Sequence, residues 1–263
     1  MNERIQPGTD DIRARHIKRQ LQHRRTMRRR RIIFFTVLGI AAVLIVLFFT
    51  PLFNIKNIKI YGNSRIETAV IKQAIGSVEE ENLFRLDTKK IIKNVKALPY
   101  ADDLKIKKKI FPAGLEVTVT ECIPVCYIPY NEGSVILDKN FRVLEISETP
   151  FEGLCELGGI GVVSAVPAAI LSPDDDDRMA TACECISSLI ENGLIDKIGR
   201  IDFSDMSNIV FTYENRLNVV CGSSVDFSKK IAMFTKAVNS SKLNENSRGT
   251  LDISISGKAI YTP

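Results

Sequence analysis

The feature that most constrains this chain is a stretch of 19 residues, 32–50, without a charged side chain (IIFFTVLGIAAVLIVLFFT). As an α-helix rising ~1.5 Å per residue it would be about 29 Å long, which matches the ~30 Å hydrocarbon core of a bilayer. A core helix of a soluble protein rarely runs this far without a polar residue stronger than Thr. A cleaved signal peptide would have a shorter apolar region followed by small residues, whereas Phe49, Leu52 and Phe53 are bulky. The stretch is therefore predicted to be an uncleaved transmembrane helix.

Charge is distributed unevenly on the two sides of this stretch. Residues 1–31 hold 11 basic and 3 acidic residues, whereas residues 51–263 hold 25 basic and 28 acidic ones. The overall charge of +5 therefore comes from the N-terminal tail. The positive-inside rule predicts a cytoplasmic tail, 1–31, and an extracytoplasmic part, 51–263. The residues that carry this signal, and that would attract anionic headgroups, are Arg24, Arg25, Arg28, Arg29, Arg30 and Arg31.

The outer part lacks the residues that most catalytic and metal sites need. Both histidines, His16 and His23, lie in the tail, which argues against a His-dependent hydrolase or a His-ligated zinc site outside. There is no P-loop and no Ser-x-x-Lys motif. The aspartates at 174–177 follow Pro173 and precede an apolar-periodic segment, which favours a helix start over a calcium loop. We therefore predict no catalytic residues, no cofactor, no metal and, because the outer part is not basic, no nucleic-acid partner.

The six cysteines leave two alternatives open. An even number in an extracytoplasmic part is compatible with disulfides. However, no C-x-x-C motif is present, and a domain of this length does not need covalent links, so buried free thiols are favoured. The cysteines are Cys122, Cys126, Cys155, Cys183, Cys185 and Cys221.

Apolar periodicity predicts a small α+β module directly after the span. Residues 53–61 are predicted to form a strand, and Ser64 with Glu67 three residues later predicts the capping box of a first helix. In that helix Ile66, Val70 and Ala74 share one face, with Ile71 and Ile75 beside them. A second helix should begin at Asp87 and stop before Pro99. One strand is expected at 104–110, with its lysines on the solvent-exposed face, and another is expected at 115–120.

This order and its motifs resemble the POTRA domain of the FtsQ/DivIB family of bacterial cell-division proteins. The opening F-x-I-x-x-I-x-I-x-G-N begins at Phe53, N-x-F-R-L-D begins at Asn82, and Glu121-x-x-Pro124 closes the module. The family often has Trp at the position of Phe111 and Arg at that of Cys122. The resemblance implies a POTRA domain at 53–125.

The remaining residues, 126–263, are predicted to form the β domain of the same family. One hairpin is expected at 133–146, with its turn at 138–140, and a second is expected around Glu214-Asn215. Helices are expected at about 174–192 and 226–239. The motifs that carry the resemblance here are Arg200-Ile201-Asp202, Val219-Val220-x-Gly222-Ser223, Lys230 and Gly249-x-Leu251-Asp252. The expected fold class is thus α+β, with a disordered tail, one transmembrane helix, a βααββ POTRA domain and a mixed β-rich domain with flanking helices.

The resemblance implies a non-enzymatic, single-pass scaffold of the division septum. Family members assemble with the bitopic proteins FtsL and FtsB/DivIC and regulate the septal peptidoglycan synthase. Their partner contact involves the last strand and the preceding helix. On this chain these positions are Phe234, Ile253, Ser254, Ile255, Ser256, Gly257, Lys258, Ala259, Ile260 and Tyr261.

Alternation within the last strand refines this expectation. Ile253 and Ile255 should face the core, so the backbone with Ser254, Ser256 and Lys258 would make the contact by strand addition. Deleting 249–263 is expected to abolish partner binding while the POTRA domain stays folded. The alternatives are a membrane-anchored, chaperone-like POTRA receptor and a cell-wall enzyme or inhibitor.

Overall fold

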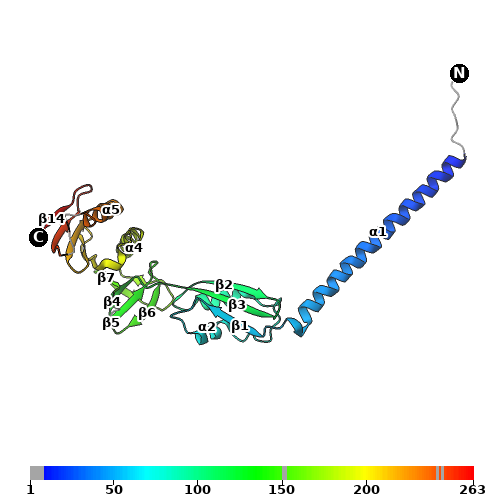
Figure 1. Cartoon of the computed structure of the whole chain (residues 1–263), viewed down its shortest axis with the longest axis horizontal. Helices are drawn as coiled ribbons and strands as arrows, with labels where there is room; N and C mark the ends of the chain where they lie inside the picture. Colours follow the sequence, from blue (N-terminus) through cyan, green and yellow to red (C-terminus); the bar gives the residue numbers. More distant parts are fainter. Residues whose placement is uncertain (1–8, 150–152, 241–242, 244–245) are drawn as a thin grey trace, which may run out of the picture. The chain divides into compact units, whose positions relative to one another are not determined.

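The computed structural model of the chain describes residues 9–149, 153–240, 243 and 246–263 (Figure 1). Contacts within it define two compact units. One unit runs up to Lys59 and includes Val78–Leu86 and Lys108–Leu115. The other comprises Ile60–Ser77, Asp87–Lys107 and Glu116–Pro263.

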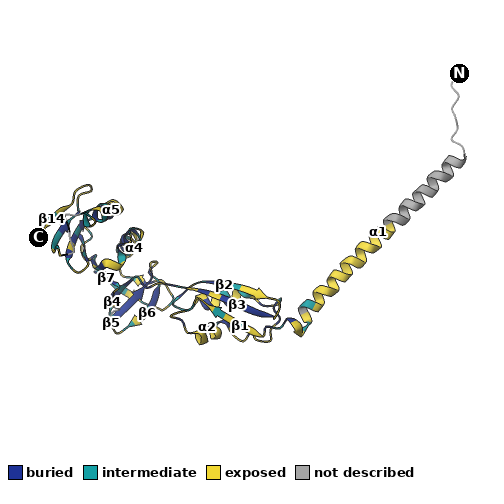
Figure 2. Cartoon of the chain, in the orientation of Figure 1, coloured by how far each residue is buried: buried dark blue, intermediate teal, exposed yellow. Residues whose placement is uncertain are grey.

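The first unit is dominated by α1, Thr9–Phe49. Within it, Met27–Leu47 is long and apolar enough to cross a membrane, and none of that segment is buried in the protein (Figure 2). The expectation of a disordered tail is wrong for the described residues, because residues 9–31 continue the same helix. The sequence explains this difference: Pro7 and Gly8 precede Thr9, and residues 9–31 contain neither a proline nor a glycine.

The C-terminal end of α1 is fastened to a later segment of its own unit. The side-chain amide of Asn82 donates to the main-chain oxygens of Leu47 at 3.1 Å and Thr50 at 3.2 Å. The last carbonyl groups of a helix lack partners within the helix, so Asn82 satisfies groups that α1 leaves open. The Arg85 guanidinium also lies 5.9 Å from the centre of the Phe49 ring. Segment 78–86 thereby holds the end of the helix.

The predicted order of strand, helix, helix, strand, strand follows α1. A short 3₁₀ turn, Pro51–Phe53, precedes β1 (Asn57–Tyr61), α2 (Thr68–Ile75), α3 (Thr88–Lys96), β2 (Ala101–Lys109) and β3 (Gly114–Glu121). The strands form a sheet in the order β1-β3-β2. The first strand begins later than predicted, since Pro51 favours a turn start. As predicted, Leu115, Val117 and Val119 of β3 are buried.

The start of the first helix differs from the predicted capping box. α2 begins at Thr68, and its N-cap Glu67 makes no side-chain cap hydrogen bond. Instead, the carboxylate of Glu121 accepts from the main-chain N–H groups of Ser64 at 2.8 Å, Arg65 at 2.9 Å and Ile66 at 2.9 Å. Partial burial of Glu121 would raise its pKa, but these hydrogen bonds outweigh it and lower the pKa below its ordinary value. The partner of the turn thus lies more than 50 residues away in sequence.

The buried face of α2 differs from the prediction at one position, and the start of α3 agrees with it. Val70 was expected on the buried face of α2 but is 39% exposed, whereas Ile66, Ile71 and Ile75, which were expected on or beside that face, are buried. The start of α3 is confirmed: the Asp87 carboxylate accepts from the N–H groups of Lys89 and Lys90 at 3.0 and 3.2 Å.

The remaining strands build a nine-stranded mixed sheet with the order β14-β13-β12-β11-β10-β7-β4-β5-β6. Both predicted hairpins are present, as β5–β6 and β11–β12, and β10–β7, β4–β7 and β12–β13 are parallel pairs. A separate pair joins β8 (Val162–Ser164) and β9 (Ser172–Pro173). The nine strands are Cys126–Tyr130 (β4), Gly133–Leu137 (β5), Val143–Ser147 (β6), Cys155–Gly158 (β7), Ile198–Asp202 (β10), Ile209–Tyr213 (β11), Leu217–Gly222 (β12), Gly249–Asp252 (β13) and Ile260–Thr262 (β14).

Two helices, α4 (Asp176–Glu191) and α5 (Phe227–Val238), contribute to one apolar core with this sheet. The helix-start reading of the aspartates is confirmed, because Asp175 is the N-cap of α4 and accepts from the N–H of Arg178 at 2.9 Å. All six cysteines are free, and all except Cys183 are buried. Burial raises the pKa of the Cys155 and Cys221 thiols to about 12, so both are neutral and poorly reactive.

Arg142 links the start of β6 to the end of α3. Its guanidinium donates to the main-chain oxygens of Lys96 at 2.6 Å, Leu98 at 2.9 Å and Ala101 at 3.0 Å. A small apolar cluster of Cys122, Ile136 and Leu144 lies in the same unit, with Tyr100 packed against it. The β5–β6 hairpin is therefore joined to the βααββ module by both apolar and polar contacts.

Candidate partner-binding site

The C-terminal residues form a short hairpin at one edge of the nine-stranded sheet. β13 pairs with β12 in parallel and with β14 in antiparallel register, Leu251 opposite Tyr261. β14 is the outermost strand, so one side of it has no partner strand in the sheet. Main-chain N–H and C=O groups on such an edge are available to another chain.

The predicted single last strand is wrong in one respect. The strand ends at Asp252, and the chain turns through residues 255–257, where the N–H of Lys258 donates to the oxygen of Ile255 at 3.1 Å. Gly257 has a φ of +87°, which favours glycine in this turn. Ile255 was expected to face the core but is 63% exposed, because the turn takes it out of the strand alternation. Ile253 is fully buried, as predicted.

The other residues of the predicted site divide into exposed and buried ones. Ser256, Gly257, Lys258, Ala259 and Ile260 are exposed, whereas Ser254 and Tyr261 are half-buried. The Tyr261 hydroxyl donates to the main-chain oxygen of Arg248 at 2.6 Å. Ile255 and Ile260 thus contribute two exposed apolar side chains to the surface of the hairpin, and Lys258 contributes one positive charge.

Phe234 does not belong to this surface. It is fully buried, and its ring packs edge-on against Phe211 and Tyr213, with centroid distances of 5.2 and 5.1 Å. Its role is to pack α5 against β11, and the expectation of a direct partner contact is corrected accordingly. The helical spacing of Phe227, Ile231 and Phe234 is the sequence signal for this burial, and all three are buried.

Lys230 links α5 to the sheet next to the hairpin, and Gly249 sets the close approach of β13 to the end of β14. Lys230 is buried, and its ammonium group donates to the main-chain oxygens of Cys221 at 2.9 Å and Ser223 at 2.8 Å. Gly249 approaches Thr262 so closely that a side chain at Gly249 would collide with the Thr262 main-chain oxygen. The position of β14 therefore depends on a glycine in β13.

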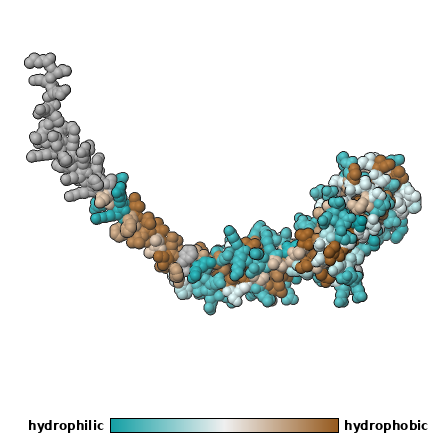
Figure 3. All heavy atoms as spheres, turned by 180° about the vertical axis from the view of Figure 1, so that it is seen from behind, coloured by the Kyte–Doolittle hydropathy of each residue, from teal (hydrophilic) through white to brown (hydrophobic). Residues whose placement is uncertain are grey.

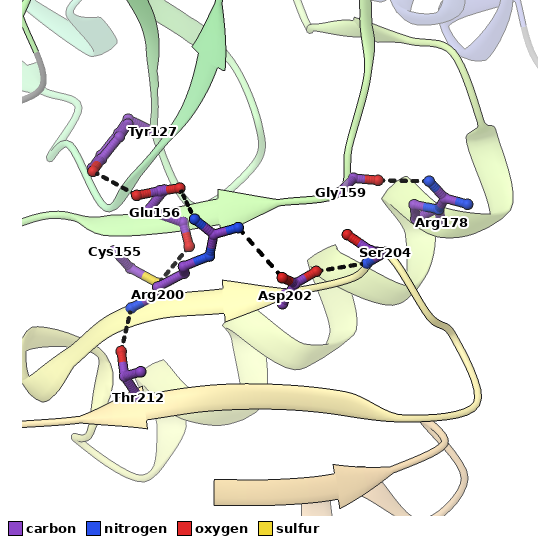
Figure 4. Close-up of polar contacts among 9 residues, drawn as sticks. All are labelled: Tyr127, Cys155, Glu156, Gly159, Arg178, Arg200, Asp202, Ser204 and Thr212. Atoms are coloured by element: carbon purple, nitrogen blue, oxygen red, sulfur yellow. Dashed lines mark hydrogen bonds and ion pairs between the residues drawn. The ribbon is translucent and has the colours of Figure 1, made fainter. Parts of the chain in front are cut away.

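A polar network crosses the middle strands of the sheet (Figure 4). Arg200 contacts Glu156 at 2.7 Å and Asp202 at 3.3 Å, and the Tyr127 hydroxyl donates to Glu156 at 3.1 Å. Hydrogen bonds from the side chain and main chain of Ser204, and the Arg200 cation, keep the pKa of Asp202 below its ordinary value, although partial burial opposes them. The side chains of Arg200 and Asp202 are 48% and 41% exposed, which suits a solvated network that supports strand register better than a catalytic centre.

Neither the network nor the rest of the described chain presents a metal site. Among the described residues, no group of three or more His, Cys, Asp or Glu side chains is placed to hold a metal ion.

The arginines predicted to set topology all lie in α1. Arg28, Arg29, Arg30 and Arg31 are exposed, at the N-terminal end of the apolar stretch. Arg24 and Arg25 belong to the same helix, and their side chains lie outside the described part.

Comparison with known proteins agrees with this architecture. Residues 53–121 match the family model of the POTRA domain, FtsQ-type. Cell division protein DivIB of Clostridium botulinum is 28% identical over 213 residues, which cover 80% of this chain and 82% of the relative. DivIB of Clostridium acetobutylicum is also 28% identical, over 81% of this chain and 84% of the relative. Cell division protein FtsQ of Corynebacterium glutamicum is 29% identical over 51% of this chain and 63% of the relative. The chain thus carries an FtsQ-type POTRA domain and, over most of its length, is similar to the DivIB and FtsQ cell-division proteins.

Proposed function

We propose that this protein is a non-enzymatic, single-pass scaffold of the bacterial division machinery. Its similarity to DivIB and FtsQ supports a role in cell division. The apolar part of α1 would anchor it, with the arginines on the cytoplasmic side and the POTRA and β domains outside. The partners would be FtsL-like and FtsB/DivIC-like bitopic proteins, and through them the septal peptidoglycan synthase.

The observation that carries the partner-binding part of this proposal is the free edge of β14. A partner strand would bond to the open side of β14 through main-chain groups, which supplies affinity, while neighbouring side chains supply specificity. Ile255, at 63% exposed, and Ile260, at 44% exposed, offer apolar contacts next to that edge. Lys258 adds a positive charge, which favours a partner segment with an acidic residue beside its apolar ones.

A fluorescent fusion to the N-terminal tail tests the cell-division role. Midcell rings in dividing cells are the expected result. A uniform membrane signal in cells whose septal synthase is at midcell would contradict the proposal.

Substitution of Ile260 by glutamate tests the edge directly. A charge on the outermost strand discourages pairing with another strand. We expect Ile260→Glu to weaken co-purification of the DivIC-like and FtsL-like proteins about tenfold, which corresponds to ~1.4 kcal/mol of binding free energy. The substitution should leave the fold intact, because the side chain is already exposed.

The opposite edge of the same sheet offers a matched control. Ile146 on β6 is 46% exposed, close to the 44% of Ile260, so Ile146→Glu introduces the same charge at a similar exposure. Partner binding should survive this control. Equal losses in both variants, or none in either, would place the contact elsewhere. The point substitutions are preferable to deletion of 249–263, since that segment contains buried Leu251 and Ile253.

A further inference from the structure

Several large apolar side chains are exposed close to the outer end of α1. Leu52 in the 3₁₀ turn is 60% exposed, and Ile110 and Phe111, between β2 and β3, are 49% and 72% exposed. Phe49, in the last turn of α1, is 74% exposed. Such residues would have an unfavourable contact with water if nothing covered them.

These side chains belong to one compact unit with the candidate span. The segment Lys108–Leu115 lies in the unit that contains α1. The Phe111 ring lies 6.1 Å from the Phe53 ring, and the N–H of Lys56 donates to the oxygen of Ala113 at 3.0 Å. Asn82 in turn holds the main-chain oxygens of Leu47 and Thr50. The loop is therefore fixed to the end of the helix.

The distance from the helix end to Phe53, which contacts the loop, is comparable with the thickness of a headgroup layer. A 3₁₀ turn rises about 2 Å per residue, so Phe53 lies roughly 8 Å beyond Phe49 at most if that rise holds over the four steps. The polar layer on each side of the hydrocarbon core is about 5–8 Å thick. A helix that spans the bilayer therefore brings Phe53 to the level of the headgroups, with the Phe111 ring 6.1 Å from the Phe53 ring.

Basic side chains accompany the apolar ones. Beyond α1, this unit contains more basic than acidic residues. The five basic ones are Lys56, Lys59, Arg85, Lys108 and Lys109, and the three acidic ones are Glu79, Glu80 and Glu81. Lys108 and Arg85 are exposed. Phe and Leu side chains of interfacial segments insert at the boundary between headgroups and acyl chains, and basic residues favour anionic headgroups.

We propose that Leu52, Lys108, Ile110 and Phe111, which we call the membrane-proximal tip, contact the outer leaflet. The apolar side chains enter the headgroup region. Lys108, whose ammonium group donates to the Leu86 main-chain oxygen at 3.4 Å, and Arg85, next to Leu86 in sequence, meet lipid phosphates. The occupant is a lipid surface, because the tip belongs to the same compact unit as the apolar helix (brown in Figure 3) and carries the charge that suits anionic lipid. This inference rests on the proposed membrane anchoring by α1 and goes beyond it, since a simple tether would leave the tip in water.

The absence of tryptophan from the chain makes a direct test available. The full-length Phe111→Trp variant would be reconstituted in vesicles of phosphatidylcholine and phosphatidylglycerol with bromine on the acyl chains near the glycerol. We expect emission at short wavelength and quenching comparable with that of a Phe49→Trp variant at the helix end. A Val225→Trp variant, at a 69% exposed position before α5, should be unquenched.

The outcomes separate this inference from the anchoring itself. Quenching of Phe49→Trp without quenching of Phe111→Trp overturns the lipid contact and leaves the anchor intact, whereas no quenching of either contradicts both. If Phe111→Trp is unquenched by lipid but becomes shielded from acrylamide when the FtsL-like and DivIC-like proteins are added, the tip is a protein contact and the lipid inference is wrong.

The charge of the tip has its own readout. Omitting phosphatidylglycerol should reduce the quenching of Phe111→Trp more than that of Phe49→Trp, and Lys108→Gln should remove this difference. Quenching of Phe111→Trp that is independent of anionic lipid would overturn the contact of Lys108 with phosphate.

Discussion

Replacement of Arg142 by methionine is expected to lower the free energy of unfolding by roughly 3 kcal/mol. The guanidinium donates to three main-chain oxygens, those of Lys96, Leu98 and Ala101. Methionine keeps much of the apolar part of the side chain but leaves these three oxygens without that donor. Hydrogen bonds to a charged group contribute about 1.5–3 kcal/mol each, and the expected total is smaller than their sum because bonds that share one guanidinium are not additive. Urea denaturation of the full chain in detergent, followed by circular dichroism, measures the change.

Arg200 provides the matched control for this prediction. It also bonds several groups, but its side chain is 48% exposed and its partners Glu156 and Asp202 are accessible to water. Solvent screening limits such pairs to about 0–1 kcal/mol, so Arg200→Met should have a much smaller effect. A loss for Arg142→Met no greater than that for Arg200→Met would show that the link between α3 and β6 contributes little.

Glu121→Gln is expected to destabilise the protein by about 2 kcal/mol at neutral pH. The carboxylate accepts from three consecutive main-chain N–H groups, at Ser64, Arg65 and Ile66. A glutamine retains one acceptor oxygen and turns an NH₂ group toward donors, so it replaces charge-assisted hydrogen bonds with fewer neutral ones. Denaturation at a series of pH values measures both the size of the effect and its origin.

The pH dependence follows from the lowered pKa of Glu121. A carboxyl group whose pKa is lower in the folded state contributes stability above its unfolded pKa, about 4.5 here, and loses it as the pH falls through the folded pKa. The difference between wild type and Glu121→Gln should therefore be constant near neutral pH and shrink in acid. Glu67→Gln is the control, since the Glu67 side chain makes no cap hydrogen bond, and it should stay within about 0.5 kcal/mol of wild type. A difference for Glu121→Gln that persists unchanged in acid would rule out the charge as its cause.

Local patterns predicted the elements whose partners lie nearby in sequence. The alternation of Leu115, Val117 and Val119 identified β3, and Asp87 correctly marked the start of α3, because its carboxylate binds N–H groups only two and three residues away. Ser64 failed as a cap because the donors there bind a carboxylate from a distant strand. No local rule contains that contact, although Glu121 had been singled out through the family motif.

The candidate site was only partly predictable for a similar reason. The alternation of apolar and polar residues correctly placed Ile253 in the core, but it could not predict the turn at 255–257 that exposes Ile255. A glycine at 257 was the available signal for that turn. Family resemblance pointed to the C-terminal region of the chain, yet it did not distinguish Phe234, which is fully buried in the core, from Ile260, which is exposed.

The hydrogen bonds from Asn82 to the end of α1 have a consequence for helical phase. Because these hydrogen bonds hold the last turn of the helix, each face of α1 has a fixed direction around the helix axis relative to segment 78–86. One residue inserted between Leu38 and Gly39 would rotate the N-terminal half of the helix by about 100° relative to that segment, whereas four inserted residues would bring it back to within about 40°. The number of residues in this helix is thus constrained by the rotation about the helix axis that each residue adds, as well as by hydrophobicity.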